Sequence, residues 1–446
     1  MIGDPLVLAL AMVGVMFVLL LSSTWIGFSL IGTGIAGLLM YDLNLPPTLS
    51  IWDKIGDLLA NSMWNSMNSW ALSALPLFVF MGEILYRTAI STKLLNGLVP
   101  WLTRIPGRLY HINVVACSLF AAVSGSSAAT TATVGKITLD ELTKRGYHKS
   151  LALGSLAGAG TMGFLIPPSL IMIIYGVLSD TSIGKLFIAG IIPGLILALL
   201  YSLYIISQSL LHPEYVPEEQ EASYSWGQRL GLLREILPVF LLIALVLGGI
   251  YMGITTPTEA AAIGVVGALA LALYFRNLTW ESFKEACLAA VRTSAMICFI
   301  IAGAAFLSQI VGFVGIARAL SEYIASLHLS PYVLILVIGI MYLFLGMILD
   351  GISIVVMTLP IVLPIVVQAG FTPLWFGIYL VFMVELSQIT PPVGFSLFII
   401  QHISQQDLPT ILKATFPFFL IMIFMAVLVT LFPELVFYLP AKMVGG

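Results

Sequence analysis

The sequence predicts an all-α protein that crosses a membrane several times and contains an inverted repeat. Of its 446 residues, 60% are hydrophobic and only 9% are charged, and the mean hydropathy is +1.08. A soluble domain carries about 25% charged residues, so this composition does not suit a surface that faces water on all sides. Apolar runs of about 17–25 residues, long enough to cross a hydrocarbon core of roughly 30 Å, recur along the chain.

The composition also excludes several classes of function. The net charge of −3 offers no basic face for nucleic acid. The three cysteines, Cys117, Cys287 and Cys298, have neither paired nor metal-ligand spacing, and they are interpreted as packed free thiols. The five histidines form no metal-binding motif. We therefore expect no organic cofactor and no enzymatic activity.

The first third of the chain predicts a group of scaffold helices. Apolar runs lie at Leu6–Leu21 and Gly27–Met40, followed by an amphipathic stretch at Ile51–Trp70 and a further apolar run at Leu72–Leu85. The amphipathic stretch, rich in tryptophan, suits an interfacial or scaffold-packing helix. Because the first run lacks a basic leader and a small-residue cleavage site, it is interpreted as a retained span.

The longest polar interruption, His212–Arg234, divides the chain into two nearly equal halves that share a pattern. In the first half, SGSS at Ser124–Ser127 precedes a proline pair at Pro167-Pro168, which follows Gly125 by 42 residues. In the second half, DGIS at Asp350–Ser353 precedes Pro391-Pro392, which follows Gly351 by 40 residues. Two interrupted apolar segments at matching places in two halves indicate a mid-membrane binding site.

Charge placement predicts that both interruptions are re-entrant hairpins that enter from opposite faces. The 27-residue apolar stretch Leu109–Gly135 has basic residues at both ends, which is typical of cytoplasmic loops. These are Arg104, Arg108, Lys136, Lys144, Arg145 and Lys149. From Leu327 to Gln401 there is no lysine or arginine, which suits a second hairpin opening toward the periplasm. Opposed hairpins are what an inverted-topology repeat requires.

Irregular backbone inside a membrane must be buried in protein or line a cavity, so we expect the two turns to bind ions. Sodium is a hard cation that prefers carbonyl, hydroxyl and carboxylate oxygens. A first sodium site is predicted at Ser124, Gly125 and Ser126, faced by Gly160, Thr161 and Gly163. A second is predicted at Asp350, Gly351 and Ser353, faced by Gln388 and Thr390. At least two sodium ions are therefore expected.

Proline adds to this prediction because it leaves the carbonyl four residues earlier without its helical donor. Pro167 and Pro391 would thereby free the carbonyl oxygens of Gly163 and Ser387. The alternative is that these small residues only allow close helix packing. Asp350 lies in an apolar run, where a carboxylate favours an ion or substrate role over a structural one. For Glu385 the roles of proton carrier, helix cap and interfacial residue stay open.

The motif residues resemble the large membrane subunit of tripartite ATP-independent periplasmic (TRAP) transporters, over essentially the whole chain. The stretches that carry this resemblance are FAAVSGSSAATTATVG (Phe120–Gly135), GTMGFLIPPSLIMIIYG (Gly160–Gly176), LDGISIVVMTLPIVLPIV (Leu349–Val366) and ELSQITPPVGFSLFI (Glu385–Ile399). The resemblance implies a sodium-coupled, elevator-type carrier in the bacterial inner membrane. It also implies a separate small membrane subunit of four helices and a periplasmic substrate-binding protein that delivers an organic acid such as a C4-dicarboxylate, sugar acid or sialic acid, or a zwitterion.

The chain departs from the family at one place. Many members carry an aspartate where this sequence has Thr130, so no carboxylate role is expected there. Ser127, Thr130, Pro167 and Pro391 border the two predicted sodium sites, and we expect them to contact the solute.

The same pattern predicts how the chain divides. The expected segments are scaffold helices at 1–108, a first transport-domain half at 109–207, a polar connector at 208–235, second scaffold helices at 236–330, a second transport-domain half at 331–412 and a C-terminal helix at 413–446.

Two alternatives to a partner-dependent symporter subunit stay open. One is a stand-alone ion-coupled carrier of the dicarboxylate or citrate type, which would transport solute without partners. The other is a polytopic membrane enzyme, which would need a polar cluster at one interface, and the sequence offers none.

Overall fold

The computed structural model describes residues 2–41, 50–88, 90–217, 225–391 and 394–443, and helices account for nearly all regular structure in them. The only β-type pairing in these residues is an isolated bridge between Ile2 and Tyr41. In the first half the helices are α1 (Pro5–Leu21), α2 (Ile26–Met40), α3 (Ile51–Met67), α4 (Ala74–Arg87), α5 (Ile90–Leu102), α6 (Tyr110–Ser124), α7 (Ser127–Lys144), α8 (Lys149–Thr161), α9 (Leu170–Leu178) and α10 (Ile183–Leu211), with a 3-10 turn at Trp70–Ser73.

In the second half the helices are α11 (Trp226–Tyr251), α12 (Pro257–Tyr274), α13 (Trp280–Phe313), α14 (Ile316–Ser326), α15 (Pro331–Gly346), α16 (Gly351–Gln368), α17 (Pro373–Gln388), α18 (Phe395–Ser404), α19 (Leu408–Leu431) and α20 (Glu434–Phe437), with 3-10 turns at Pro213–Tyr215 and Pro440–Lys442. Most begin at a Ser, Thr or Asp whose side chain accepts a backbone N–H, as for Thr256 before α12 and Asp407 before α19.

The outer faces of the long helices are apolar and exposed, which confirms a membrane protein. Within the described residues, seven helices are long and apolar enough to cross a bilayer. On α11 the exposed side chains include Leu237, Phe240, Leu241 and Leu245, which recur at helical spacing on one face. An exposed apolar stripe of this extent is unfavourable in water and suits contact with lipid.

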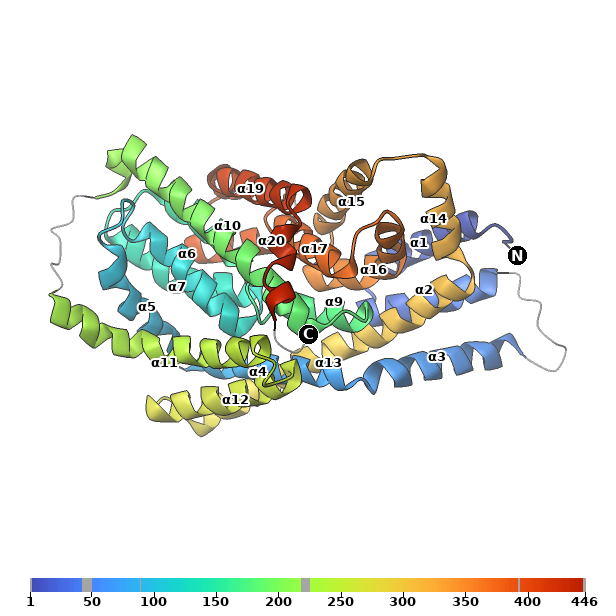
Figure 1. Cartoon of the computed structure of the whole chain (residues 1–446), viewed down its shortest axis with the longest axis horizontal. Helices are drawn as coiled ribbons and strands as arrows, with labels where there is room; N and C mark the ends of the chain where they lie inside the picture. The colour runs from blue at the N-terminus through green and yellow to red at the C-terminus, as the bar shows by residue number, and fades with distance from the viewer. Residues whose placement is uncertain (1, 42–49, 89, 218–224, 392–393, 444–446) are drawn as a thin grey trace.

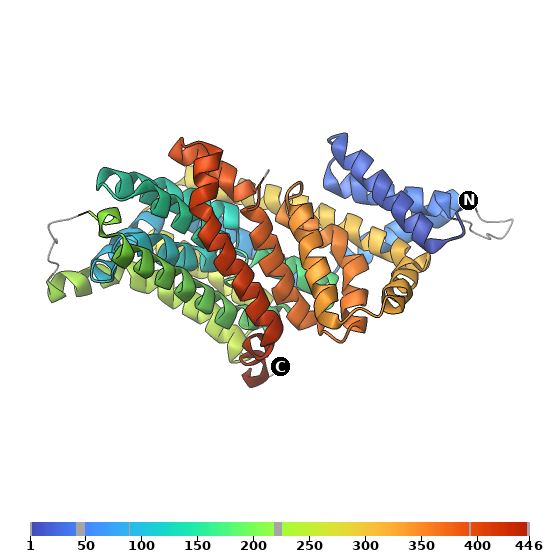
Figure 2. The same ribbon diagram turned by 90° about the horizontal axis from the view of Figure 1, so that it is seen from above.

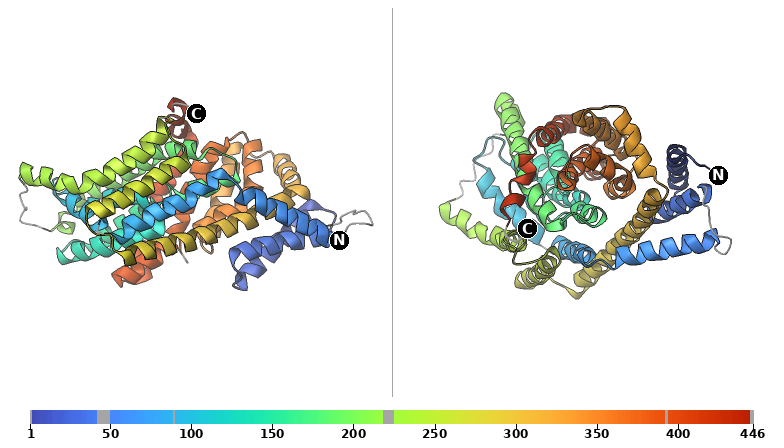
Figure 3. Two further views of the ribbon diagram at one scale, coloured as in Figure 1. Left: turned by 90° about the horizontal axis from the view of Figure 1, so that it is seen from below. Right: turned by 45° about the vertical axis from the view of Figure 1, so that its right-hand side comes forward.

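A layer of helices from both halves runs along one side of the molecule (Figure 1; Figure 3, left). In this layer α13 packs on α2, α3 and α4, while α12 packs on α4 and α11, and α11 also packs on α5. The two halves are therefore interleaved, because helices from the N-terminal third pair with helices that follow the polar connector.

The remaining helices form two similar sets, and helices of each set pack on helices of the other. Each set holds a hairpin, a helix that is broken at its middle, and a long helix: α6–α7, α8–α9 and α10 in the first set, α15–α16, α17–α18 and α19 in the second. Across the sets, α7 packs on α18 as α16 packs on α9, and α8 packs on α19 as α17 packs on α10. Reciprocal pairing of this kind is what two repeats related by an internal two-fold axis produce.

Figures 1 and 2 show where the two sets lie. The pair α6–α7 lies on the left of Figure 1 and the pair α15–α16 on the right, with α9 between them. Seen from above, α19 crosses the middle of the molecule diagonally (Figure 2). The two sets therefore contact each other in the middle of the molecule, through the helix pairs named above.

Candidate ion and solute site at the helix breaks

The first hairpin turns on a glycine in the left-handed conformation. Helix α6 ends at Ser124, Gly125 has φ +60°, and Ser126 caps α7 by accepting the Ala129 N–H at 3.4 Å. A residue with a side chain is strained at this φ, so glycine permits the tight reversal. Ser124 also contacts Thr130, hydroxyl to hydroxyl, at 3.0 Å across the turn.

This tip is packed directly on the break between α8 and α9, as the sequence predicted. The Leu170 N–H donates to the Gly125 carbonyl at 3.3 Å, and the Ser127 hydroxyl donates to the Thr161 carbonyl at 2.7 Å. A Cβ added at Gly163 would lie 2.6 Å from the Ser127 nitrogen. These three contacts hold the first tip directly against the break.

All six residues of the first predicted sodium site are thus brought together. The Gly163 carbonyl accepts no hydrogen bond from any described residue, in agreement with the effect predicted for Pro167. Ser126 is half-buried, while Gly160 and Thr161 are buried behind it. Ser127 and Thr130, which we expected to contact solute, are completely buried and hydrogen-bonded inside the protein.

The second tip is built differently, because its aspartate caps the helix that follows. This exposed carboxylate caps α16: it accepts the N–H groups of Ile352 at 3.1 Å and Ser353 at 3.4 Å. The Ser353 hydroxyl donates to it as well. Asp350 therefore has a local capping role as well, and its role as an ion ligand stays a prediction.

The residues predicted to face this tip lie beside it without bonding to it. A Cβ added at Gly351 would meet Val384, one turn before Gln388, at 2.5 Å. The Thr390 hydroxyl donates to the Leu386 carbonyl of its own helix at 2.7 Å. Among the described residues, no hydrogen bond links Asp350 or Ser353 to Gln388 or Thr390.

One expectation about the second break is wrong. The Ser387 carbonyl is not freed by Pro391, because it accepts the Thr390 N–H at 3.3 Å as the last turn of α17 tightens. Pro391 itself is exposed, and Pro392 lies outside the described residues. The first break contains a cis peptide bond between Pro167 and Pro168.

Helix N-termini, which carry a partial positive charge, and helix C-termini, which carry a partial negative charge, lie together where the two tips adjoin the first break. The first residues of α7, α9 and α16 lie together, because Leu170 bonds to Gly125 and a Cβ at Gly351 would lie 3.2 Å from Ile171. The last residues of α6 and α8 adjoin the same turn. A helix carries roughly +0.5 charge at its N-terminus and −0.5 at its C-terminus, so the centre offers N–H groups to an anion and carbonyls to a cation.

Sequence reasoning left open one residue that the structure places at this centre. Glu385 of α17 is completely buried, and its Oε1 accepts the Phe164 N–H of the first break at 2.9 Å. A carboxylate in an apolar run already indicated that Glu385 has a special role. Nothing in the sequence indicated its partner, which lies 221 residues away. The described residues contain no group of three or more His, Cys, Asp or Glu side chains suited to a transition metal.

Comparison with known proteins gives a consistent result. The sequence model of the family described as "Tripartite ATP-independent periplasmic transporter, DctM component" matches residues 13–435. The chain is 33% identical to a C4-dicarboxylate TRAP transporter large permease protein of Pseudomonas aeruginosa, over 86% of this chain and 89% of that one. It is 32% identical to an ectoine TRAP transporter large permease protein of Halomonas elongata, over 83% and 86%.

A solved structure resembles the fold at low sequence identity. The YdaH transporter of Alcanivorax borkumensis, whose crystal structure is described as having an unusual topology, superposes with a TM-score of 0.62 at 14% identity. The match covers 92% of this chain and 97% of that one. At this identity the likeness concerns the fold alone.

Proposed function

This chain belongs to the DctM family of tripartite ATP-independent periplasmic transporters, and on that premise we propose that it imports a small organic acid together with sodium ions. As a member of this family it is a multi-pass protein of the bacterial inner membrane and a transport subunit rather than an enzyme. The solute, the coupling ion and the mechanism are the parts that we propose.

The observation that carries the proposal is the meeting of helix ends at the two breaks. The N-termini of α7, α9 and α16 would stabilise a solute carboxylate, while the Gly163 carbonyl and the Ser126 hydroxyl would coordinate sodium. Charges of both signs would then enter together, which lowers the cost of moving either one through the membrane. A carboxylate also fits relatives named for C4-dicarboxylate and for ectoine.

We further propose an elevator mechanism in which the two hairpins and the two broken helices move as one body. The reciprocal packing of α7 on α18, α16 on α9 and α8 on α19 supports a common body, because each set depends on the other for burial. The layer that contains α3, α4, α11, α12 and α13 would stay in place. A separate small membrane subunit of four helices would extend that layer, and a periplasmic binding protein would deliver the solute.

Transport by a reconstituted complex tests this function. The chain is placed in liposomes with the proposed small membrane subunit and periplasmic binding protein, and uptake of carboxylate solutes is followed. We expect uptake only with an inward sodium gradient and with the binding protein present. Uptake that persists when potassium replaces sodium contradicts the coupling, and uptake without the binding protein supports the stand-alone carrier instead.

Ser126→Ala is expected to weaken sodium-dependent uptake while the protein still inserts and folds. Its half-buried hydroxyl is the most accessible one at the first tip, and its loss removes one proposed sodium ligand and a helix cap. If the loss costs about 1 kcal/mol, the half-saturating sodium concentration is expected to increase by about fivefold. The matched control is Ser66→Ala on α3, whose hydroxyl bonds to the Met63 carbonyl of its own helix and to no other described residue.

A further inference from the structure

The unwound segment at residues 162–169, between α8 and α9, is shared by both hairpin tips. On one side the Gly125 carbonyl accepts the Leu170 N–H that immediately follows the segment, and Gly163 abuts Ser127. On the other side a Cβ at Gly351 would lie 3.3 Å from the Phe164 ring. The segment is therefore a common floor that both tips contact.

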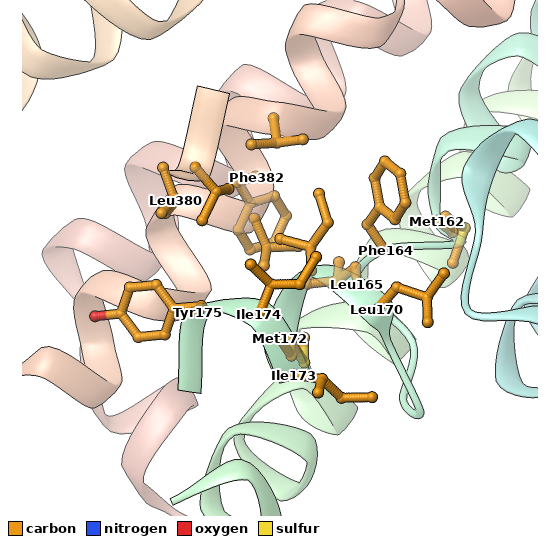
Figure 4. Close-up of a cluster of buried hydrophobic side chains, with 14 of the residues drawn as sticks. Met162, Phe164, Leu165, Leu170, Met172, Ile173, Ile174, Tyr175, Leu380 and Phe382 are labelled. Atoms are coloured by element: carbon orange, nitrogen blue, oxygen red, sulfur yellow. The ribbon is translucent and has the colours of Figure 1, made fainter. Parts of the chain in front are cut away.

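One polar contact fixes this floor to the second set of helices. Glu385 accepts the Phe164 N–H at 2.9 Å, and the Leu165 N–H and the Thr161 hydroxyl also face the carboxyl group. Figure 4 shows Phe164, Leu165 and Leu170 in one apolar cluster with Phe382 of α17, on the helix that carries Glu385. An N–H left unpaired in such surroundings costs several kcal/mol, so the carboxyl group stabilises this backbone conformation.

The surroundings of Glu385 favour a neutral carboxyl group. The residue is completely buried at the centre of the helical body, and its Oε2 has no hydrogen-bond partner among the described residues. The other titratable group that faces it is the hydroxyl of Tyr201 on α10, which also has no partner there. The structure places no Lys, Arg or His beside it among the described residues. An ionised carboxylate with one hydrogen bond is far more costly in this position than a neutral one.

We propose that Glu385 is a positioning residue that, as a neutral acceptor, clamps the floor between the two tips and thereby makes the two sodium sites fill cooperatively. When sodium orders the first tip, the tip packs against Gly163 and fixes the position of residues 162–169, which Glu385 also holds. Through Phe164 the same segment supports Gly351, so the second tip is ordered in turn. This inference rests on the proposed sodium coupling and adds the residue that links the sites.

The test compares two substitutions of nearly equal volume. Glu385→Gln keeps a neutral acceptor for the Phe164 N–H, whereas Glu385→Met fills the space without one. Sodium is titrated against the thermal unfolding midpoint of the purified complex and against the rate of uptake. We expect the Gln variant to keep the wild-type Hill coefficient, and the Met variant to show a coefficient near one with about tenfold weaker sodium dependence.

Ser396→Ala is the matched control, because this α18 hydroxyl is also completely buried without a partner but touches neither tip through any described hydrogen bond. It should titrate like the wild type. If Glu385→Gln loses cooperativity while remaining folded, a neutral clamp is contradicted; the same holds if Glu385→Met keeps it. A Met variant that fails to fold leaves the Gln result to decide. If the wild-type protein shows no sodium response, the proposed sodium coupling itself is contradicted. This outcome differs from a failure of the Glu385 proposal, in which the wild type responds to sodium.

Discussion

Replacing Gly163 by alanine is expected to abolish sodium-driven uptake. The new Cβ would lie 2.6 Å from the Ser127 nitrogen and 2.7 Å from the Ser126 carbonyl carbon, both of them backbone atoms at the start of a helix. Because no side chain can rotate away, the first tip must separate from the break. Overpacking of this kind costs about 1–3 kcal/mol. Here the atoms that must move belong to the first tip, so the strain displaces the proposed sodium ligands.

Uptake in reconstituted liposomes and the sodium-dependent shift of the unfolding midpoint measure this effect. We expect uptake to fall by at least about tenfold and the sodium shift to disappear. Gly231→Ala on α11 is the matched control, because a Cβ there meets no atom within 4 Å. Normal sodium dependence in a folded Gly163→Ala protein would show that the tip and the break do not form the ion site together.

Much of the fold follows from patterns that a sequence carries locally. The apolar runs predicted the membrane helices, and the duplicated Gly and Pro-Pro motifs predicted two hairpins and two broken helices. Gly125 is a clear case: a glycine between serines in an apolar stretch predicts a turn, and it adopts φ +60° there. The direction in which each hairpin enters the membrane stays a prediction from loop charges.

The parts that sequence reasoning missed depend on contacts between distant segments or on competition between local bonds. The capping of α16 by Asp350 was not foreseen, because the carboxylate was considered only as an ion or substrate ligand, a role that stays a prediction. Ser387 was expected to have a free carbonyl, but a tightened last turn occupies it. Glu385 could not be assigned, because its partner lies on the other repeat.

Gly154→Ala is expected to have the largest effect on stability, because it acts where the two sets of helices are joined. A Cβ at this position of α8 would lie 2.1 Å from the Ala414 carbonyl oxygen of α19, so the two helix backbones are in contact. Close approach of this kind is what small residues permit in membrane proteins. Separating the helices should cost roughly 3 kcal/mol and lower the unfolding midpoint by several degrees.

Gly158→Ala, one turn later on the same face of α8, tests whether backbone contact is the cause. There the three nearest atoms are the Cβ and two ring carbons of Phe418, at 2.8–3.0 Å, so the contact involves a side chain and no backbone carbonyl. We therefore expect Gly158→Ala to lower the unfolding midpoint clearly less than Gly154→Ala, with Gly14→Ala, where a Cβ meets nothing within 4 Å, close to the wild type. Midpoints close to the wild type for both variants would mean that α8 and α19 are free to move apart. The two repeats would then not be held together by this contact, and a common moving body would need another connection.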